Sequence, residues 1–360
     1  MPTTHTIRHR NGEYPVLIGE SLLTELARLA ERHLPGRRLV VITDRNVARA
    51  LDSPLPVPTL VVAPGERSKS RRRWADLSDK LLSLGYGRDS AVVALGGGVV
   101  GDLAGFVAAT YLRGVPWLQV PTTLLAMVDA SVGGKTGVDT AHGKNLIGAF
   151  HPPAAVIADP GALRTLPEAV YRAGLAEVIK HGVIADEEYL SRVERETDAI
   201  LKRDEATLMR LVHRSVEIKG AVVMRDEFET GERAILNAGH TVAHAIESVS
   251  GYEVPHGEAV AIGLVAEAAL AEELGLAEAG VSARIRALND ALGLPVMLPE
   301  DFRVDDLLDA MSHDKKSLNG ATRFALPAAI GRMARDGEGW TVPADRTAIS
   351  AALRVVGAKD

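Results

Sequence analysis

The stretch SAVVALGGGVVGD, residues 90–102, decides the fold of this chain. Its small and apolar beginning predicts a buried strand, and the glycines at 96, 98 and 101 match G-x-G-x-x-G before a helix expected to reach Tyr111. Such glycines let the backbone approach a diphosphate, whose oxygens accept the free N–H groups at the helix start. The ribose-binding acid expected about 20 residues later is missing, since the next acid after Asp102 is Asp129. A tight turn without a ligand therefore stays open, and Asp44, at the end of another strand, is a second candidate for the ribose.

Short apolar runs on both sides of this stretch predict further strands, with helical spacing between them. This alternation is typical of a mostly parallel sheet with crossover helices. After Pro160, Ala, Leu, Glu and Arg at helical spacing take over, so we expect an α/β domain over residues 1–163 and a mainly helical domain over 164–360. The predicted strands are 38–43, 59–62, 90–95, 115–120 and 154–159; the predicted helices are 167–184, 186–202, 204–225, 234–249, 257–274 and 279–291, with another starting in 298–308 and an extended segment or strand pair at 323–331.

Composition limits what the chain binds. Its 360 residues carry a net charge of −6, so the molecule as a whole does not attract nucleic acid or an anionic membrane, and an anionic ligand needs a local cluster of cations. The absence of cysteine excludes disulfides, thiolate metal sites and a cysteine nucleophile, which leaves His, Asp and Glu as metal ligands. The first residues lack an apolar leader, and the longest run without Asp, Glu, Lys or Arg has 15 residues, too few to span a bilayer. We expect a cytoplasmic protein.

Two segments combine lysines with turn residues. SVGGKTGVDTAHGKNLIGAFH, residues 131–151, places Lys135 and Lys144 among five glycines, a composition that suits phosphate or carboxylate binding, although a flexible loop without a ligand is the alternative. It is not a Walker A loop, because that motif does not occur there. SHDKKSLNG, residues 312–320, offers Lys315 and Lys316 before a turn, where they either close over an anion or stay solvated.

Three histidines lie close together in the sequence. NAGHTVAHAIE (237–247) places His240 and His244 four residues apart on one helical face, and His256 opens the next predicted helix. Imidazoles and a carboxylate from different helices are what a catalytic zinc site with an open position requires. Spacing alone favours His240 and His244 as the ligand pair, but the H-E-x-x-H glutamate is absent. Buried or capping histidines without a metal are the alternative for each position taken singly.

GLAEVIKHGVI, residues 174–184, adds Glu177, Lys180 and His181 within one helical turn. Glu177 is a candidate carboxylate ligand. We expect His181 on the surface of the helix, away from the metal.

These segments together resemble the 3-dehydroquinate synthase family, a group of sugar phosphate cyclases, over most of the chain. The resemblance implies an N-terminal Rossmann-like NAD-binding domain and a C-terminal helical domain that binds metal and substrate. The matching blocks are PGERSKS (64–70), ALGGGVVGDLAGFVAATYLRGV (94–115), QVPTTLLAMVDASVGGKTGVD (119–139), GKNLIGAFHPP (143–153), RAGLAEVIKHGVI (172–184), EIKGAVV (217–223), LNAGHTVAHAIE (236–247), HGEAVAIG (256–263) and HDKK (313–316).

The resemblance also implies which residues hold the cofactors. The metal, Zn2+ in this family with Co2+ as a possible substitute, falls to Glu177, His240 and His256, while His244 lies beside it and assists proton transfer. This ligand set replaces the pair favoured by spacing. The implied NAD+ contacts are Asp44, Glu66, Lys69, Gly97, Gly98, Val99, Val100, Gly101, Asp102, Thr122, Thr123, Lys135, Lys144 and Thr165.

The implied reaction converts 3-deoxy-D-arabino-heptulosonate 7-phosphate to 3-dehydroquinate and phosphate, a step of the shikimate pathway to aromatic amino acids. It proceeds by transient oxidation with NAD+, β-elimination of phosphate, re-reduction, ring opening and aldol closure. The resemblance implies a homodimer, because Arg113 is expected to reach the phosphate from the neighbouring subunit. The other implied substrate contacts are Asp129, Lys135, Asn145, Lys180, Lys219, Arg233, Asn237, His244 and Lys316.

Three other functions fit parts of this pattern. Another sugar phosphate cyclase is the nearest, but valiolone-type members lose the residues that are Asn237 and His244 here, which leaves an aminodehydroquinate synthase as the harder one to exclude. A metal-dependent polyol dehydrogenase would not need Lys180, Lys219, Arg233 and Lys316 together. A binding protein without catalysis would have no use for both a metal set and a nucleotide turn.

Overall fold

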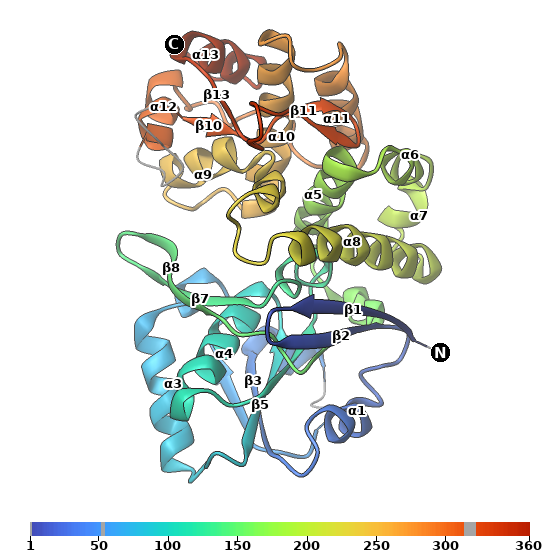
Figure 1. The fold of residues 1–360 in the computed structure, drawn as a ribbon, viewed down its shortest axis with the longest axis vertical. Coiled ribbons are helices and arrows are strands. Elements are labelled where there is room, and N and C mark those ends of the chain that lie inside the picture. Colours follow the sequence, from blue (N-terminus) through green and yellow to red (C-terminus); the bar gives the residue numbers. More distant parts are fainter. Residues whose placement is uncertain (1, 52–54, 313–321) are drawn as a thin grey trace. The chain divides into compact units, whose positions relative to one another are not determined.

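A seven-stranded sheet forms the centre of the N-terminal part of the chain. The computed structural model describes residues 2–51, 55–312 and 322–360. The strand order is β1-β2-β9-β6-β5-β3-β4, with every neighbouring pair parallel except β1 and β2. Figure 1 shows β1 and β2 side by side as an antiparallel pair. The mostly parallel sheet predicted from the sequence is confirmed. The strands are β1 (Thr3–His9), β2 (Gly12–Ile18), β3 (Arg38–Asp44), β4 (Thr59–Val62), β5 (Ser90–Gly96), β6 (Trp117–Pro121) and β9 (Ala155–Ala158).

The interior strand β5 explains why residues 90–96 are so apolar. All seven of its residues are buried, because both faces of a parallel sheet are covered. Val92 lies in a core cluster with residues of α3 and α4, and its neighbour Val93 lies in a second cluster with residues of α1. Side chains that alternate between two cores require apolar residues at every position. The helices of this part are α1 (Leu26–His33), α2 (Arg45–Ala50), α3 (Arg71–Ser83) and α4 (Gly98–Thr110).

The glycine-rich segment 131–151, for which a flexible loop was the alternative, has regular structure. It contains an antiparallel hairpin of β7 (Lys135–Thr140) and β8 (Gly143–Phe150). Gly137 and Gly148 face each other across it, and a Cβ at Gly148 would come within 2.3 Å of the Thr136 carbonyl oxygen. Glycine is therefore needed for close packing of the two strands, which composition alone cannot distinguish from flexibility.

Helices dominate the rest of the chain, as expected. The predicted helix 186–202 is divided in two, and the predicted helix 234–249 begins only at His240, because Gly239 takes a left-handed φ of 79° after a 3-10 turn at Glu232–Asn237. The helices are α5 (Glu168–Ala185), α6 (Glu187–Arg195), α7 (Thr197–Leu201), α8 (Glu205–Arg225), α9 (His240–Val249), α10 (His256–Glu273), α11 (Val281–Ala291), α12 (Val304–Ser312) and α13 (Arg346–Val355). Strand β10 (Arg323–Phe324) pairs with β13 (Val342–Pro343), and β11 (Pro327–Ala329) pairs with β12 (Arg332–Met333).

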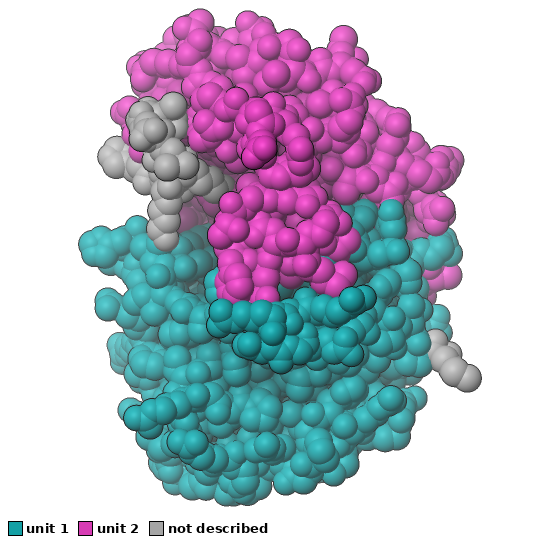
Figure 2. All heavy atoms as spheres, viewed as in Figure 1, with its two compact units in different colours: residues 1–167, 208–220 teal, residues 168–207, 221–360 magenta. Residues whose placement is uncertain are grey.

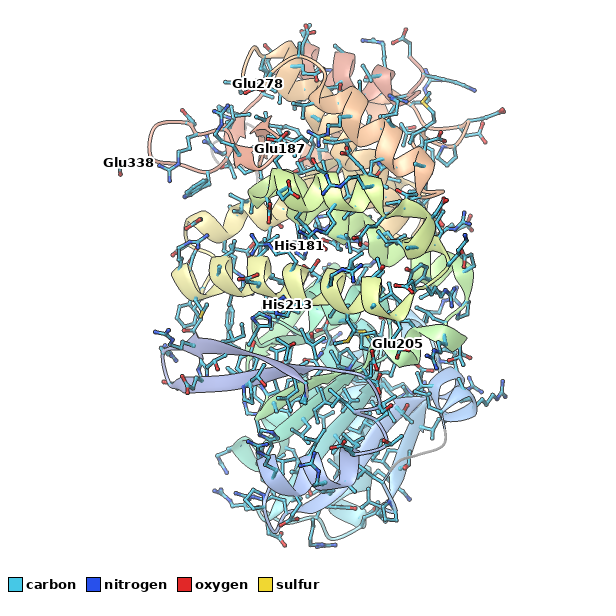
Figure 3. All side chains as sticks on the ribbon, turned by 90° about the vertical axis from the view of Figure 1, so that its right-hand side faces the viewer. His181, Glu187, Glu205, His213, Glu278 and Glu338 are labelled. Carbon is cyan, nitrogen blue, oxygen red and sulfur yellow. The ribbon has the colours of Figure 1, made fainter. Side chains whose placement is uncertain are left out.

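The chain divides into two compact units, coloured in Figure 2. The first contains residues 1–167 and 208–220, and the second contains 168–207 and 221–360. The middle of α8 belongs to the first unit because it packs on β1: the rings of His213 (labelled in Figure 3) and His5 are 4.2 Å apart. The expected domain boundary between 163 and 164 stays a prediction. None of the described helices has the length and apolar character needed to cross a membrane.

Candidate active site

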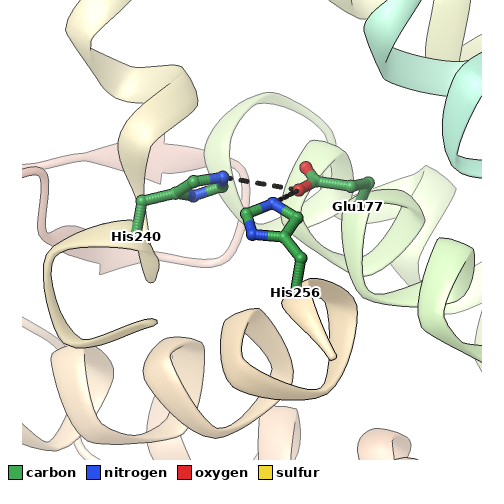
Figure 4. A group of neighbouring side chains, drawn as sticks. All are labelled: Glu177, His240 and His256. Atoms are coloured by element: carbon green, nitrogen blue, oxygen red, sulfur yellow. Dashed lines mark ion pairs between the residues drawn. The ribbon is translucent and has the colours of Figure 1, made fainter. Parts of the chain in front are cut away.

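Two histidines and a glutamate from three helices of the second unit converge (Figure 4). His240 is the first residue of α9, His256 is the first residue of α10, and Glu177 lies in the middle of α5. The Nε2 atoms of His240 and His256 are 3.5 and 3.8 Å from the same Glu177 oxygen, Oε1. All three donor atoms lie within 4.8 Å of one another. This is a donor set that Zn2+ and Co2+ bind, with room for a further ligand.

The second nitrogen of each imidazole faces a hydrogen-bond acceptor. His240 Nδ1 lies 3.1 Å from the Ala238 carbonyl oxygen, and His256 Nδ1 lies 3.3 Å from Oε2 of Glu247. When Nδ1 carries the proton of a neutral imidazole, the lone pair of Nε2 is available to bind a metal in both rings. The rings therefore present Nε2, the atom that faces Glu177, for metal binding.

Burial and charge separate the pKa values of the two histidines in the absence of a metal. Burial is the largest influence on His240 and lowers its pKa to about 4, although Glu177 opposes the shift. Burial alone would lower the pKa of His256 too, but its hydrogen bonds to Glu177 and Glu247 and their charges raise it to about 9. His240 is thus neutral and ready to coordinate, whereas His256 has a proton to release when a metal binds.

Lys180 is a fourth member of this group. It follows Glu177 by three residues on α5, its ammonium group contacts the other carboxylate oxygen, Oε2, and it is 1% exposed. Glu177 therefore faces two imidazoles with one oxygen and a cation with the other. A lysine fixed beside a metal-ligand carboxylate is placed to attract an anionic or hydroxyl-bearing substrate.

Close backbone contacts explain the glycines around these helices. A Cβ on Gly257 would lie 2.0 Å from the Ala173 carbonyl oxygen of α5, and a Cβ on Gly263 would lie 2.0 Å from the Gly239 carbonyl oxygen. The buried carboxylate of Glu267 on α10 accepts the N–H groups of Gly239 at 2.7 Å and Val242 at 3.1 Å. It thereby satisfies orphan donors at the start of α9, the helix that opens with His240.

In the first unit, the glycine turn 97–102 forms the start of α4. Lys69 is buried, and its Nζ lies 2.5 Å from Oδ2 of Asp102 and 3.7 Å from Oε1 of Glu66. Burial raises the pKa of Asp102 even though Lys69 opposes the shift. A Cβ on Gly97 would lie 3.0 Å from Cγ2 of Thr123, so the residue at the N-cap must be small.

Two buried hydroxyls lie at the carboxyl ends of parallel strands in the seven-stranded sheet. Thr43 near the end of β3 and Thr122 just after β6 have Oγ1 atoms that find no hydrogen-bond partner among the described residues. Ligands of open parallel sheets bind at this end of the strands. Asp44, at the end of β3, uses its carboxylate to cap α2 by accepting the N–H groups of Asn46 and Val47. Its role with a ribose stays a prediction.

Two expected substrate contacts pair within the first unit. Lys219 Nζ lies 2.9 Å from Oδ1 of Asp129 and donates to the Asp129 carbonyl oxygen at 2.6 Å. In the β7–β8 hairpin, Asn145 has a left-handed φ of 55°, and its N–H donates to Oδ1 of Asp139 at 2.9 Å. Lys144 precedes it, and Lys135 is exposed at the start of β7.

The segment before α9 holds two more expected contacts. Asp226 accepts the N–H groups of Thr230, Gly231 and Arg233 at 2.8 to 3.0 Å. Burial alone would raise the pKa of Asp226, but these hydrogen bonds lower it more. Arg233 is buried and donates to the Glu227 carbonyl oxygen, while Asn237 donates to Oε1 of Glu229 at 2.8 Å.

The remaining expected residues are less closely grouped. The His244 ring lies 5.7 Å from the His240 ring, edge to face, and outside the group of three donors. Arg113 is exposed at a turn where Leu112, Arg113 and Gly114 all have positive φ. Thr165 is exposed at the end of a 3-10 turn. Lys315 and Lys316 lie outside the described residues.

One expectation is wrong, and two supporting residues were missed. His181, labelled in Figure 3, is not on the helix surface but fully buried, because α5 is buried without a break from Gly174 to Ile184. Sequence reasoning also missed Glu247 and Glu267, which support the helices that bear the histidines. The signal for Glu247 was its place seven residues after His240, on nearly the same helical face.

The fold is that of the sugar phosphate cyclases, and two solved examples carry NAD+ and a metal ion. A solved 2-deoxy-scyllo-inosose synthase, complexed with carbaglucose-6-phosphate, NAD+ and Co2+, matches with a TM-score of 0.89 and 25% identity, over 98% of this chain and 99% of that one. A 2-epi-5-epi-valiolone synthase from Streptomyces hygroscopicus subsp. jinggangensis with bound NAD+ and Zn2+ matches with a TM-score of 0.85 and 29% identity, over 95% and 96%.

The chain belongs to the 3-dehydroquinate synthase family. The model of the N-terminal part, 3-dehydroquinate synthase N-terminal, matches residues 59–173, and the model of the C-terminal part, 3-dehydroquinate synthase C-terminal, matches residues 174–317. The 3-dehydroquinate synthase of Symbiobacterium thermophilum is 48% identical over 331 residues, which cover 89% of this chain and 92% of that protein. The family resemblance inferred from the sequence blocks is confirmed.

Proposed function

We propose that this chain is a 3-dehydroquinate synthase that converts 3-deoxy-D-arabino-heptulosonate 7-phosphate to 3-dehydroquinate and phosphate, in the shikimate pathway. The observation that carries the proposal is the group of Glu177, His240, His256 and Lys180 in a chain 48% identical to an enzyme of that name. A metal site and a substrate cation meet there on one helix, α5, which supplies both Glu177 and Lys180.

The triad fits a catalytic Zn2+ or Co2+. Two imidazoles and one carboxylate are a common catalytic donor set, and three protein ligands leave a position for substrate. Such an ion, when bound, lowers the pKa of a coordinated hydroxyl and so favours its oxidation. Three residues of the chain would hold the ion: Glu177 would supply the negative charge, and the Nδ1 partners of His240 and His256 orient both rings with Nε2 toward Glu177.

The carboxyl end of the sheet fits NAD+. The N–H groups at the start of α4 are suited to a diphosphate, and the unsatisfied hydroxyls of Thr43 and Thr122 offer further hydrogen bonds. NAD+, when bound, supplies a hydride acceptor that returns the hydride later in the reaction. We assign the other predicted contacts, among them Lys69 with Asp102, to orienting the nucleotide.

Because the chain has a net charge of −6, an anionic substrate needs a local cluster of cations. We assign the phosphate and carboxylate of the substrate to Lys135, Lys180, Lys219, Arg233 and Lys316, with Asn145 and Asn237 as neutral partners. Fixed cations stabilise the negative charge that develops as phosphate leaves. His244, one helical turn from His240, is assigned to proton transfer.

We further infer a cytoplasmic homodimer. Arg113 supports the second subunit, because its exposed position on a turn of three positive-φ residues holds its side chain away from its own core. Sedimentation tests the dimer, and cell fractionation tests the location.

One assay tests the proposed function. Purified protein is mixed with the heptulosonate phosphate, NAD+ and Zn2+, and phosphate release is followed together with the absorbance of NADH. We expect phosphate release without net NADH. Stoichiometric NADH would instead identify a polyol dehydrogenase, and no phosphate release from metal-loaded protein would reject the proposal. Comparison with the aminated substrate distinguishes an aminodehydroquinate synthase.

A further inference from the structure

Glu247 is a buried carboxylate beside the candidate metal centre. It lies in the last turn of α9, is 2% exposed, and places Oε2 3.3 Å from Nδ1 of His256. It is not among the three converging donors. A buried carboxylate is costly unless hydrogen bonds or charges compensate it, so its position next to an imidazole needs an explanation.

The helix geometry of α9 brings Glu247 to this place. Seven residues are close to two full turns, so Glu247 lies on nearly the same face as His240. The other end of the helix is held by Glu267 of α10, which accepts the N–H groups of Gly239 and Val242. Each of the two helices therefore supplies a carboxylate that supports the other: Glu267 of α10 holds the start of α9, and Glu247 of α9 meets the first residue of α10.

The two ligand histidines are supported in different ways. The Nδ1 partner of His240 is a backbone carbonyl oxygen, that of Ala238, whereas the partner of His256 is the ionisable side chain of Glu247. A carboxylate that accepts a hydrogen bond from the N–H of a ligand imidazole fixes the tautomer, orients the ring and makes it a stronger ligand. This support depends on a side chain and can therefore be removed by substitution.

We propose that Glu247 is a positioning residue of the metal centre, which accepts a hydrogen bond from Nδ1–H of His256 and so orients its Nε2 toward the metal site. The inference rests on the proposed metal site of Glu177, His240 and His256. The backbone of Glu247 has a separate role at the end of α9. The Glu247 carbonyl oxygen accepts the N–H of Tyr252 at 2.7 Å and the hydroxyl of Ser250 at 3.1 Å.

The test compares Glu247→Gln and Glu247→Ala with a control, Glu272→Gln. Glu272 is near the end of α10, and its carboxylate accepts the N–H and the hydroxyl of Ser282, each at 2.8 Å. The control thus removes a charged acceptor that joins α10 to α11, and Ser282 is not a ligand histidine. Full-length metal-free proteins are titrated with Zn2+ against a chelator, the visible spectrum of each Co2+-loaded form is recorded, and thermal unfolding of the metal-free forms is measured.

We expect the dissociation constant for Zn2+ to rise about 10-fold in Glu247→Gln and up to about 100-fold in Glu247→Ala, with a changed Co2+ spectrum. The control should stay within about twofold of the wild type. Unchanged Zn2+ affinity and an unchanged Co2+ spectrum in Glu247→Gln would overturn the inference, even if its melting temperature fell. That isosteric variant decides the matter should Glu247→Ala not fold.

The wild type and His256→Ala separate this inference from the proposed function. If the wild type binds no Zn2+, or if His256→Ala binds it as tightly as the wild type, the proposed metal site itself is wrong. If the wild type binds Zn2+ through His256 but both Glu247 variants match it, only the role of Glu247 is wrong.

Discussion

Replacing Gly257 by alanine tests whether close packing of two helices sets the geometry of the metal site. Gly257 follows His256 at the start of α10, and Ala173 lies one helical turn before Glu177 on α5. The added Cβ would lie 2.0 Å from the Ala173 carbonyl oxygen and 2.5 Å from its carbonyl carbon, both of them backbone atoms that no rotamer change can move. The two helices must separate at the point where each presents a metal ligand.

The size of this separation follows from the contact. A real Cβ essentially never comes within 3.0 Å of such an atom, so the helices must part by about 1 Å. Zinc binds imidazole nitrogen and carboxylate oxygen at about 2.0 to 2.2 Å, with a tolerance of about 0.2 Å. The displacement therefore exceeds the tolerance roughly fivefold. Fold stability changes less, because the helix propensity of alanine gains up to about 1 kcal/mol while overpacking costs about 1 to 3 kcal/mol.

We expect Gly257→Ala to fold, with a net loss of about 0 to 2 kcal/mol, and to bind Zn2+ at least about 10-fold more weakly. Chelator competition measures the affinity, and urea unfolding of the metal-free protein measures the stability. Gly182→Ala is the control: its Cβ would meet Leu190 of α6, at 2.9 Å from Cβ, instead of α10. Zn2+ affinity within twofold of the wild type in Gly257→Ala would refute the reasoning.

Four further predictions concern single side chains. His256→Ala should reduce bound zinc, measured by elemental analysis, to less than about a tenth of the wild-type content, since two donors do not form the site; full zinc content would exclude His256 as a ligand. Lys180→Ala should weaken binding of the sugar phosphate at least about 10-fold and leave NAD+ affinity, measured by calorimetry, within twofold, because it removes a charged partner of the substrate and of Glu177 but none assigned to the nucleotide; equal losses would contradict its assignment. Lys69→Met should lower the free energy of unfolding, measured in urea, by about 3 kcal/mol. This is the lower end of the range for breaking a buried ion pair, because 22% of the Asp102 side chain is exposed. A loss below about 1 kcal/mol would show that the pair contributes little. In the folded protein the pKa of Asp226 is below its usual 3.8, so the stabilisation by its carboxylate is present above that value and is lost as the pH falls through the folded-state pKa. The difference in unfolding free energy between the wild type and Asp226→Asn should therefore shrink below about pH 4. A constant difference from about pH 7 to about pH 3 would contradict this.

The sequence predicted the sheet well where burial leaves a strong pattern. Strands β3, β4 and β5 match the predicted ranges to within one residue at each end. The reason is clearest for β5, which is covered on both faces and is continuously apolar. The β1–β2 hairpin was missed, since β1 has only one buried residue, Ile7. The β7–β8 hairpin was missed because its glycines serve close packing, and composition does not reveal packing.

The site could be predicted only partly from local spacing. Spacing favoured His240 with His244 because periodicity compares residues of one helix, whereas His256 comes from the next helix and meets His240 through packing of α9 on α10. The resemblance to a family supplied the ligand set that spacing did not. His181 was misplaced for a related reason: a helix buried on every side shows no polar face by which to orient it.

The most direct measurement is a crystal structure of the zinc-loaded protein, with anomalous scattering recorded on both sides of the zinc absorption edge. We expect one peak at about 2.0 to 2.1 Å from Nε2 of His240 and of His256 and about 2.0 to 2.2 Å from a carboxylate oxygen of Glu177. A zinc peak at other side chains, with none between these three, would contradict the assignment of the metal centre.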